Sequence, residues 1–112
     1  MRGLLWYNEA MKTSNIDIPI ERIEAFCKKW KVREFSLFGS VLRDDFRPDS
    51  DVDVLLSFEP NDPWSYWDWP AITDDLVAIF GRKVDLVEKE ALRNPIRRKE
   101  ILETRRVVYA AA

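Results

Sequence analysis

FGSVLR at residues 38–43, with DVDVLLSF following at residues 51–58, is the stretch that decides the fold. The valine-rich and aromatic segment Val32–Phe38 ends at Gly39 and Ser40, which is typical of a strand that runs into a turn and a new helix. Ser40 is well placed to cap that helix. The apolar run 52–58 predicts a second strand, so two strands flank a polar loop.

Helices and one further strand surround these two strands. We expect a helix at 20–30, a loop or broken helix at 59–70, a helix at 71–80 ended by Gly81, a strand at 83–87 and a basic helix at 94–108. The alternation of helices and strands predicts an α/β or α+β fold, in which helices cover a sheet.

The composition limits the kinds of protein that this chain can be. Its 112 residues suffice for one core, which we assign to residues 20–112, with 1–19 as an N-terminal extension. A net charge of −2 gives no reason to expect direct nucleic-acid binding.

The supply of metal-binding side chains is also limited. Because the chain has no histidine and only one cysteine, Cys27, a zinc site is nearly excluded, and we interpret Cys27 as a structural thiol. The chain shows neither an apolar run of about 20 residues nor a signal peptide, so we expect a cytoplasmic protein and no membrane.

Two aspartates mark the start of the second strand. Because side chains alternate along a strand, Asp51 and Asp53 should point to the same side. Two carboxylates held together repel each other, and Mg²⁺ carrying ATP phosphates is the natural compensation. A lone Asp-x-Asp is more often a solvated turn, here with Asp49 and Ser50, and only the surrounding residues favour a metal site.

The glycine and serine of the first stretch suggest a phosphate cradle. Gly39 has no Cβ to obstruct a ligand, and Ser40 adds a hydroxyl where free backbone N–H groups can face an anion. For an isolated Gly-Ser pair after a strand, a plain turn or a helix cap is the favoured explanation. The offset of Gly39-Ser40 from the aspartates is therefore the stronger signal.

Gly39-Ser40, then ten residues, then Asp51-Val52-Asp53 resembles the signature of the minimal nucleotidyltransferase family, within the DNA polymerase β-like superfamily. Arg43 and Ser50 also stand at positions that the family pattern favours. The resemblance covers residues 20–109 and implies a nucleotidyltransferase fold with a small mixed sheet flanked by helices. The chain departs from many members, which have Ala and Gly where it has Leu42 and Asp44.

The resemblance also implies a third carboxylate, and RKVDLV at 82–87 makes Asp85 the candidate. Asp51, Asp53 and Asp85 would then be the catalytic and metal-binding residues, and Gly39, Ser40, Arg43 and Ser50 would bind the nucleotide. The implied reaction transfers AMP from Mg-ATP to an acceptor, with Asp85 as the general base, acting directly or through a second metal. Arg43 could instead pair with Asp44 or Asp45.

Small members of the family are similar to the antitoxins of HEPN/MNT toxin–antitoxin pairs, which adenylylate a tyrosine of the HEPN ribonuclease toxin. The resemblance therefore implies a partner of this type encoded by an adjacent gene, and neutralisation of the toxin. Two alternatives remain: an antitoxin that only occludes its toxin, and transfer to a small molecule or an RNA end.

Two further segments could contact a partner. An aromatic cluster could dock the partner or pack in the core. The basic residues 97–106 could contact an acidic partner or RNA, or simply face solvent. The aromatic cluster consists of Trp64, Tyr66, Trp67 and Trp69.

Overall fold

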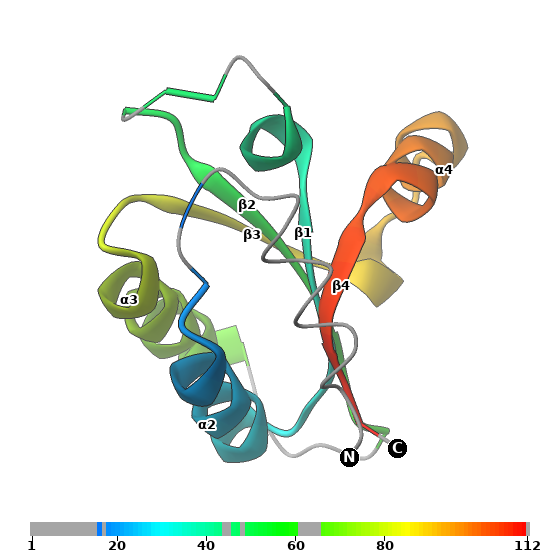
Figure 1. Ribbon diagram of the computed structural model, residues 1–112. Coiled ribbons are helices and arrows are strands. Elements are labelled where there is room, and N and C mark those ends of the chain that lie inside the picture. The colour runs from blue at the N-terminus through cyan, green and yellow to red at the C-terminus, as the bar shows by residue number, and fades with distance from the viewer. Residues whose placement is uncertain (1–15, 17, 44–45, 48, 61–65, 112) are drawn as a thin grey trace.

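A four-stranded sheet forms the centre of the protein (Figure 1). The computed structural model describes residues 16, 18–43, 46–47, 49–60 and 66–111. The strands are β1 Val32–Phe38, β2 Val52–Phe58, β3 Val84–Glu88 and β4 Arg106–Ala110, and their order across the sheet is β3-β2-β1-β4. Strand β1 is antiparallel to both β2 and β4, whereas β2 and β3 are parallel. This arrangement confirms the predicted mixed sheet flanked by helices.

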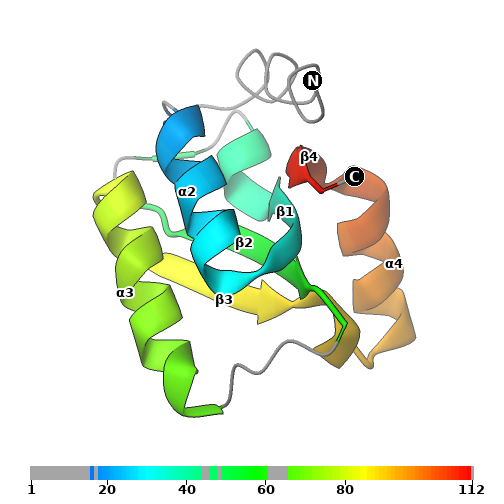
Figure 2. The same ribbon diagram turned by 90° about the horizontal axis from the view of Figure 1, so that it is seen from below.

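Two helices, α2 Ile20–Trp30 and α3 Trp69–Phe80, cover one face of the sheet (Figures 1 and 2). Their apolar stripes meet the sheet in the main core, where Phe26 packs edge-on against Phe35 with 5.9 Å between ring centroids. Gly81 ends α3 in a left-handed conformation, as predicted. Cys27 is buried in this core, and burial raises the pKa of its thiol, which fits a structural role.

A third helix, α4 Pro95–Thr104, lies over the other face of the sheet (Figures 1 and 2). The Asn94 side chain caps it by accepting hydrogen bonds from two backbone N–H groups, those of Ile96 at 3.0 Å and Arg97 at 3.1 Å. The short 3₁₀ helix η3, Lys89–Ala91, joins β3 to this region. A second, smaller core packs beneath α4 and consists of Phe38, Leu55, Leu92 and Ile101.

Two predicted elements differ from the structure. The turn after β1 is a single 3₁₀ segment, η1 Gly39–Leu42, in which Ser40 lies inside the turn and does not cap it. The basic helix expected to reach residue 108 ends at Thr104, and the chain then forms β4. Val108 and Tyr109 are buried on β4, and this burial favours an extended chain over further helix.

Two side chains of the aromatic cluster predicted from the sequence are described, and their surroundings differ. Trp69 is the first residue of α3 and packs against the main core, whereas the side chain of Trp67 is 90% exposed. Trp64 lies outside the described residues. Among the helices that the structure describes, none is both long and apolar enough to cross a membrane.

Candidate active site

Asp53 lies against the turn that follows β1. Phe38 and Asp53 are paired across β1 and β2, so the next residue, Gly39, sits beside the Asp53 carboxylate. Gly39 has a φ of +74°, and a Cβ at this position would overlap Asp53 Oδ2. The backbone N–H of Ser40 donates a hydrogen bond to the same carboxylate. The Gly-Ser turn therefore holds one of the predicted metal ligands directly, which explains why glycine is required here.

The three predicted aspartates lie at one end of the β2–β3 pair. Asp53 and Asp85 are register partners across the parallel strands, and Asp51 directly precedes β2. Partial burial raises the pKa of Asp53, and the negative charges of Asp85 and Asp51 raise it further, while the Ser40 N–H and the charge of Arg43 act in the opposite direction. Asp53 therefore lies close enough to Asp51 and Asp85 for their negative charges to disfavour its ionised form.

The carboxylates do not enclose an ion by themselves. Within the described residues, no three His, Cys, Asp or Glu side chains are placed so that they could hold a metal ion together. Mg²⁺ typically takes only one or two carboxylates from a protein and completes its shell with water and substrate phosphates. The chemistry of these donors thus fits Mg²⁺ bound together with a triphosphate, and a cation there would relieve the repulsion felt by Asp53.

The two other predicted nucleotide-binding residues differ in their surroundings. Arg43 follows η1 with an exposed side chain, and its backbone N–H donates to the Ser40 carbonyl at 2.9 Å. The Ser50 hydroxyl accepts a hydrogen bond from the Arg47 N–H at 3.0 Å, so it stabilises the loop before Asp51. Asp44 and Asp45, considered above as ion-pair partners of Arg43, lie outside the described residues.

A half-open cleft of about 720 Å³ connects this site to α4. Gly39, Arg43 and Asp53 line one side of it. The other side consists of Arg97, Glu100, Ile101, Glu103, Thr104 and Arg106. From the sequence, residues 97–106 are expected only to face solvent, an acidic partner or RNA, although Arg97, Glu100 and Thr104 have the three- and four-residue spacing of one helical face.

Comparison with known proteins gives a consistent result. Residues 19–108 match the nucleotidyltransferase domain family. The protein adenylyltransferase MntA of Thermococcus cleftensis is 37% identical over 82 residues, which cover 73% of this chain and 78% of that protein. A candidate protein adenylyltransferase of Methanocaldococcus jannaschii is 36% identical over 75 residues, or 67% of this chain and 75% of that protein.

Solved structures share the fold. A toxin–antitoxin complex with AMP-PNP contains a chain that superposes with a TM-score of 0.66 at 16% identity, covering 83% of this chain and 74% of that one. A complex of a tri-AMPylated HEPN toxin from Shewanella oneidensis with its MNT antitoxin gives a TM-score of 0.59 at 16% identity, covering 82% of this chain and 70% of that one. At these identities the likeness concerns the fold.

Proposed function

We propose, from the premise that this chain belongs to the nucleotidyltransferase domain family, that it is the antitoxin of a toxin–antitoxin pair. In this proposal it transfers AMP from Mg-ATP to a tyrosine hydroxyl of a cognate HEPN-type ribonuclease and so neutralises it. The observation that carries the proposal is the Asp53 carboxylate, held by the Gly39-Ser40 turn and in register with Asp85. The protein adenylyltransferase from T. cleftensis supports a protein as the acceptor.

The residues take the following roles in this proposal. Asp51 and Asp53 would hold Mg²⁺ with the triphosphate, and the two together with Asp85 would hold a second metal ion. The Gly39-Ser40 turn supports the phosphates, and Arg43 on the cleft wall compensates their charge. When bound, the metal ions supply positive charge that stabilises the phosphates during transfer.

The reaction is a displacement at the α-phosphorus of ATP. The acceptor oxygen forms a bond to this phosphorus, the bond to the bridging oxygen of the β-phosphate breaks, and pyrophosphate leaves. The acceptor proton passes to Asp85, which is exposed next to Asp53 and so accessible to an entering hydroxyl. AMP remains on the acceptor.

A transfer assay with the product of the adjacent gene tests this proposal. With α-labelled ATP and Mg²⁺, we expect label on the partner protein and loss of its ribonuclease activity. Combined Asp51→Asn and Asp53→Asn substitutions should abolish labelling. Asp74→Asn, a matched change at an exposed carboxylate on α3, should not.

Three results would contradict the proposal. If the double variant still protects against the toxin, the protein acts by occlusion. Label that appears in a small metabolite or at an RNA end in preference to protein would assign a different acceptor. Absence of label from every acceptor with any divalent cation would exclude transfer.

A further inference from the structure

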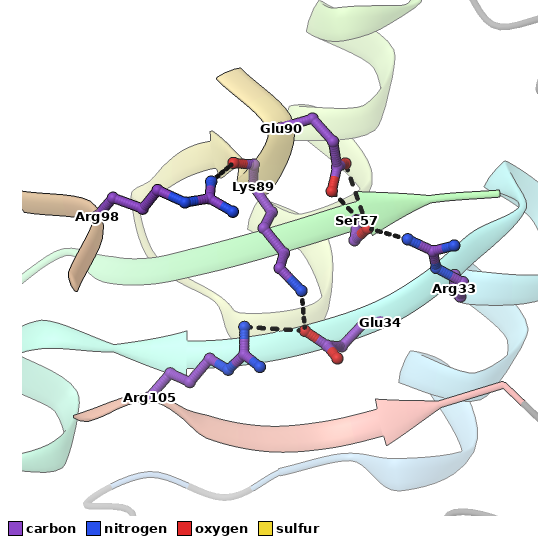
Figure 3. Close-up of polar contacts among 7 residues, drawn as sticks. All are labelled: Arg33, Glu34, Ser57, Lys89, Glu90, Arg98 and Arg105. Atoms are coloured by element: carbon purple, nitrogen blue, oxygen red, sulfur yellow. Dashed lines mark hydrogen bonds and ion pairs between the residues drawn. The ribbon is translucent and has the colours of Figure 1, made fainter. Parts of the chain in front are cut away.

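The α4 side of the cleft is joined to the sheet by a cluster of charges as well as by apolar packing. Figure 3 shows these contacts on the sheet face that α4 covers. At their centre is Glu34 of β1, whose Oε1 lies 3.1 Å from Arg105 Nη1 and 3.6 Å from Lys89 Nζ. The side chains of Glu34, Arg105 and Lys89 are 22%, 19% and 23% exposed, so all three are largely buried. We call these three residues the Glu34 clamp.

The two cations of the clamp come from the segments at either end of α4. Lys89 is the first residue of η3, three residues after Leu86 of β3. Arg105 directly follows α4 and precedes Arg106, which lines the cleft. A hydrogen bond of 3.0 Å from Arg98 Nη1 to the Lys89 carbonyl adds a direct link between α4 and η3 (Figure 3). The clamp thus connects the sheet to η3 and to the residue that directly follows α4.

The clamp pairs the Glu34 carboxylate with two cations at a largely buried position. Arg105 Nη1 is buried, and its contact with Glu34 is an ion pair that lacks the geometry of a hydrogen bond. Removing the carboxylate would leave two partly buried cations close together, which is far more unfavourable than losing a surface ion pair. The neighbouring cluster, in which the Ser57 hydroxyl accepts from Arg33 and donates to Glu90, joins β1 and β2 to η3 and does not include α4 residues in Figure 3.

We propose that Glu34 is a positioning residue for the cleft. By compensating Lys89 and Arg105 together, it fixes α4 relative to the sheet and so fixes Arg97 and Arg106 opposite Arg43 and Asp53. Glu34 itself lies outside the residues that line the cleft, so it acts through α4. The consequence for substrates rests on the proposed function, whereas the consequence for α4 does not.

Hydrogen exchange tests the structural half of the proposal. In Glu34→Gln, amides of α4 should exchange about tenfold faster than in the unmodified protein, while amides of β1 and β2 keep their rates. The matched control is Glu59→Gln, which neutralises an exposed carboxylate just after β2. Adding Lys89→Met to Glu34→Gln removes one uncompensated cation and should return most of the protection. If α4 exchanges alike in Glu34→Gln and Glu59→Gln, the proposal is wrong.

Kinetics test the functional half. Because residues of α4 line the cleft and Glu34 does not, Glu34→Gln should raise KM for Mg-ATP or for the protein acceptor about three- to tenfold and change kcat less. The double variant with Lys89→Met should recover toward the original KM. Faster exchange in α4 with unchanged KM values would reduce Glu34 to a stabilising residue and overturn its positioning role.

The positioning role of Glu34 can be tested even if the proposed function is wrong. If the unmodified protein labels no acceptor, the dissociation constant of Mg-ATP replaces KM, and a three- to tenfold weakening in Glu34→Gln still supports the clamp. If Glu34→Gln does not fold, Arg105→Met removes the shorter of the two ion pairs, the one that joins the end of α4 to the sheet. Unchanged α4 exchange and unchanged affinity in Arg105→Met would then reject the proposal.

Discussion

On the face of the sheet covered by α2 and α3, seventeen buried residues of the described chain form one apolar cluster, whereas the cluster under α4 has four. The first face includes the fully buried Phe35 and Leu76 and is held by packing. The second adds charged contacts centred on Glu34, and it also carries Asp53 and the cleft. The candidate site therefore lies on the less heavily packed face, where ion pairs as well as apolar packing hold the elements together.

The largest expected loss of stability comes from Ile72 on α3. Ile72→Ala removes a fully buried side chain from the main core, so the free energy of unfolding should fall by about 3–5 kcal/mol, measured by urea denaturation. At equal fractions folded, Mg-ATP binding should change little. A loss below about 1 kcal/mol would contradict the view that packing holds this face.

Gly39→Ala should damage the site more than the fold. The left-handed backbone and the overlap with Asp53 Oδ2 predict about 1–3 kcal/mol of destabilisation and roughly a 100-fold loss of transfer, because the carboxylate must move. Gly81→Ala is the control: its φ is also positive, at +69°, but no atom lies within 4 Å of an added Cβ. The comparison separates backbone strain from displacement of Asp53. Equal transfer by the two variants would exclude displacement as the cause.

Ile101→Ala makes the same deletion as Ile72→Ala, but on the other face. Ile101 belongs to the smaller cluster and lines the cleft, so we expect about 2 kcal/mol of destabilisation, together with weaker Mg-ATP binding. The measurements are urea denaturation and calorimetric titration. A loss as large as that of Ile72→Ala would show that the two faces are equally packed.

The smallest expected effect has the opposite sign. Because burial and the nearby Asp85 raise the pKa of Asp53, its ionised form disfavours the folded state, and this penalty develops as pH rises through the window between the unfolded and the raised folded pKa. Asp53→Asn should therefore be slightly more stable than the original protein at neutral pH, and this advantage should disappear below that window. Urea denaturation at acid and neutral pH measures it. Mg²⁺ should raise the melting temperature of the original protein and not that of the variant.

Local sequence signals predicted most of the fold and the position of Asp51 and Asp53 at the start of β2. The apolar stripe of α2 and the valine-rich run of β2 are strong local patterns, and both elements occur where predicted. Strand β4 was missed because its five residues follow a basic helix and bury only Val108 and Tyr109, a pattern too short to separate strand from helix. Its pairing with β1 is a tertiary effect.

The second wall of the cleft could not be predicted in the same way. Arg97 and Arg106 read as a solvated basic segment because nothing local shows what lies opposite them. The Glu34 clamp joins residues 34, 89 and 105, and pairing over such separations leaves no trace in composition or periodicity. The choice of Asp85 as the third carboxylate rested on the family resemblance alone, because only the register of β2 and β3 brings Asp85 next to Asp53.

The register between β2 and β3 also provides a way to recognise misfolded molecules in a preparation. A slip of one residue between β2 and β3 would send every side chain of β3 to the opposite face, so Asp85 would leave the site while Leu86 took its place beside Asp53. Spectroscopic measures of helix or strand content would barely register such a molecule as misfolded. The ability to bind a divalent cation near Asp53 would then distinguish correctly paired molecules from misregistered ones, and it would count the native fraction of a preparation.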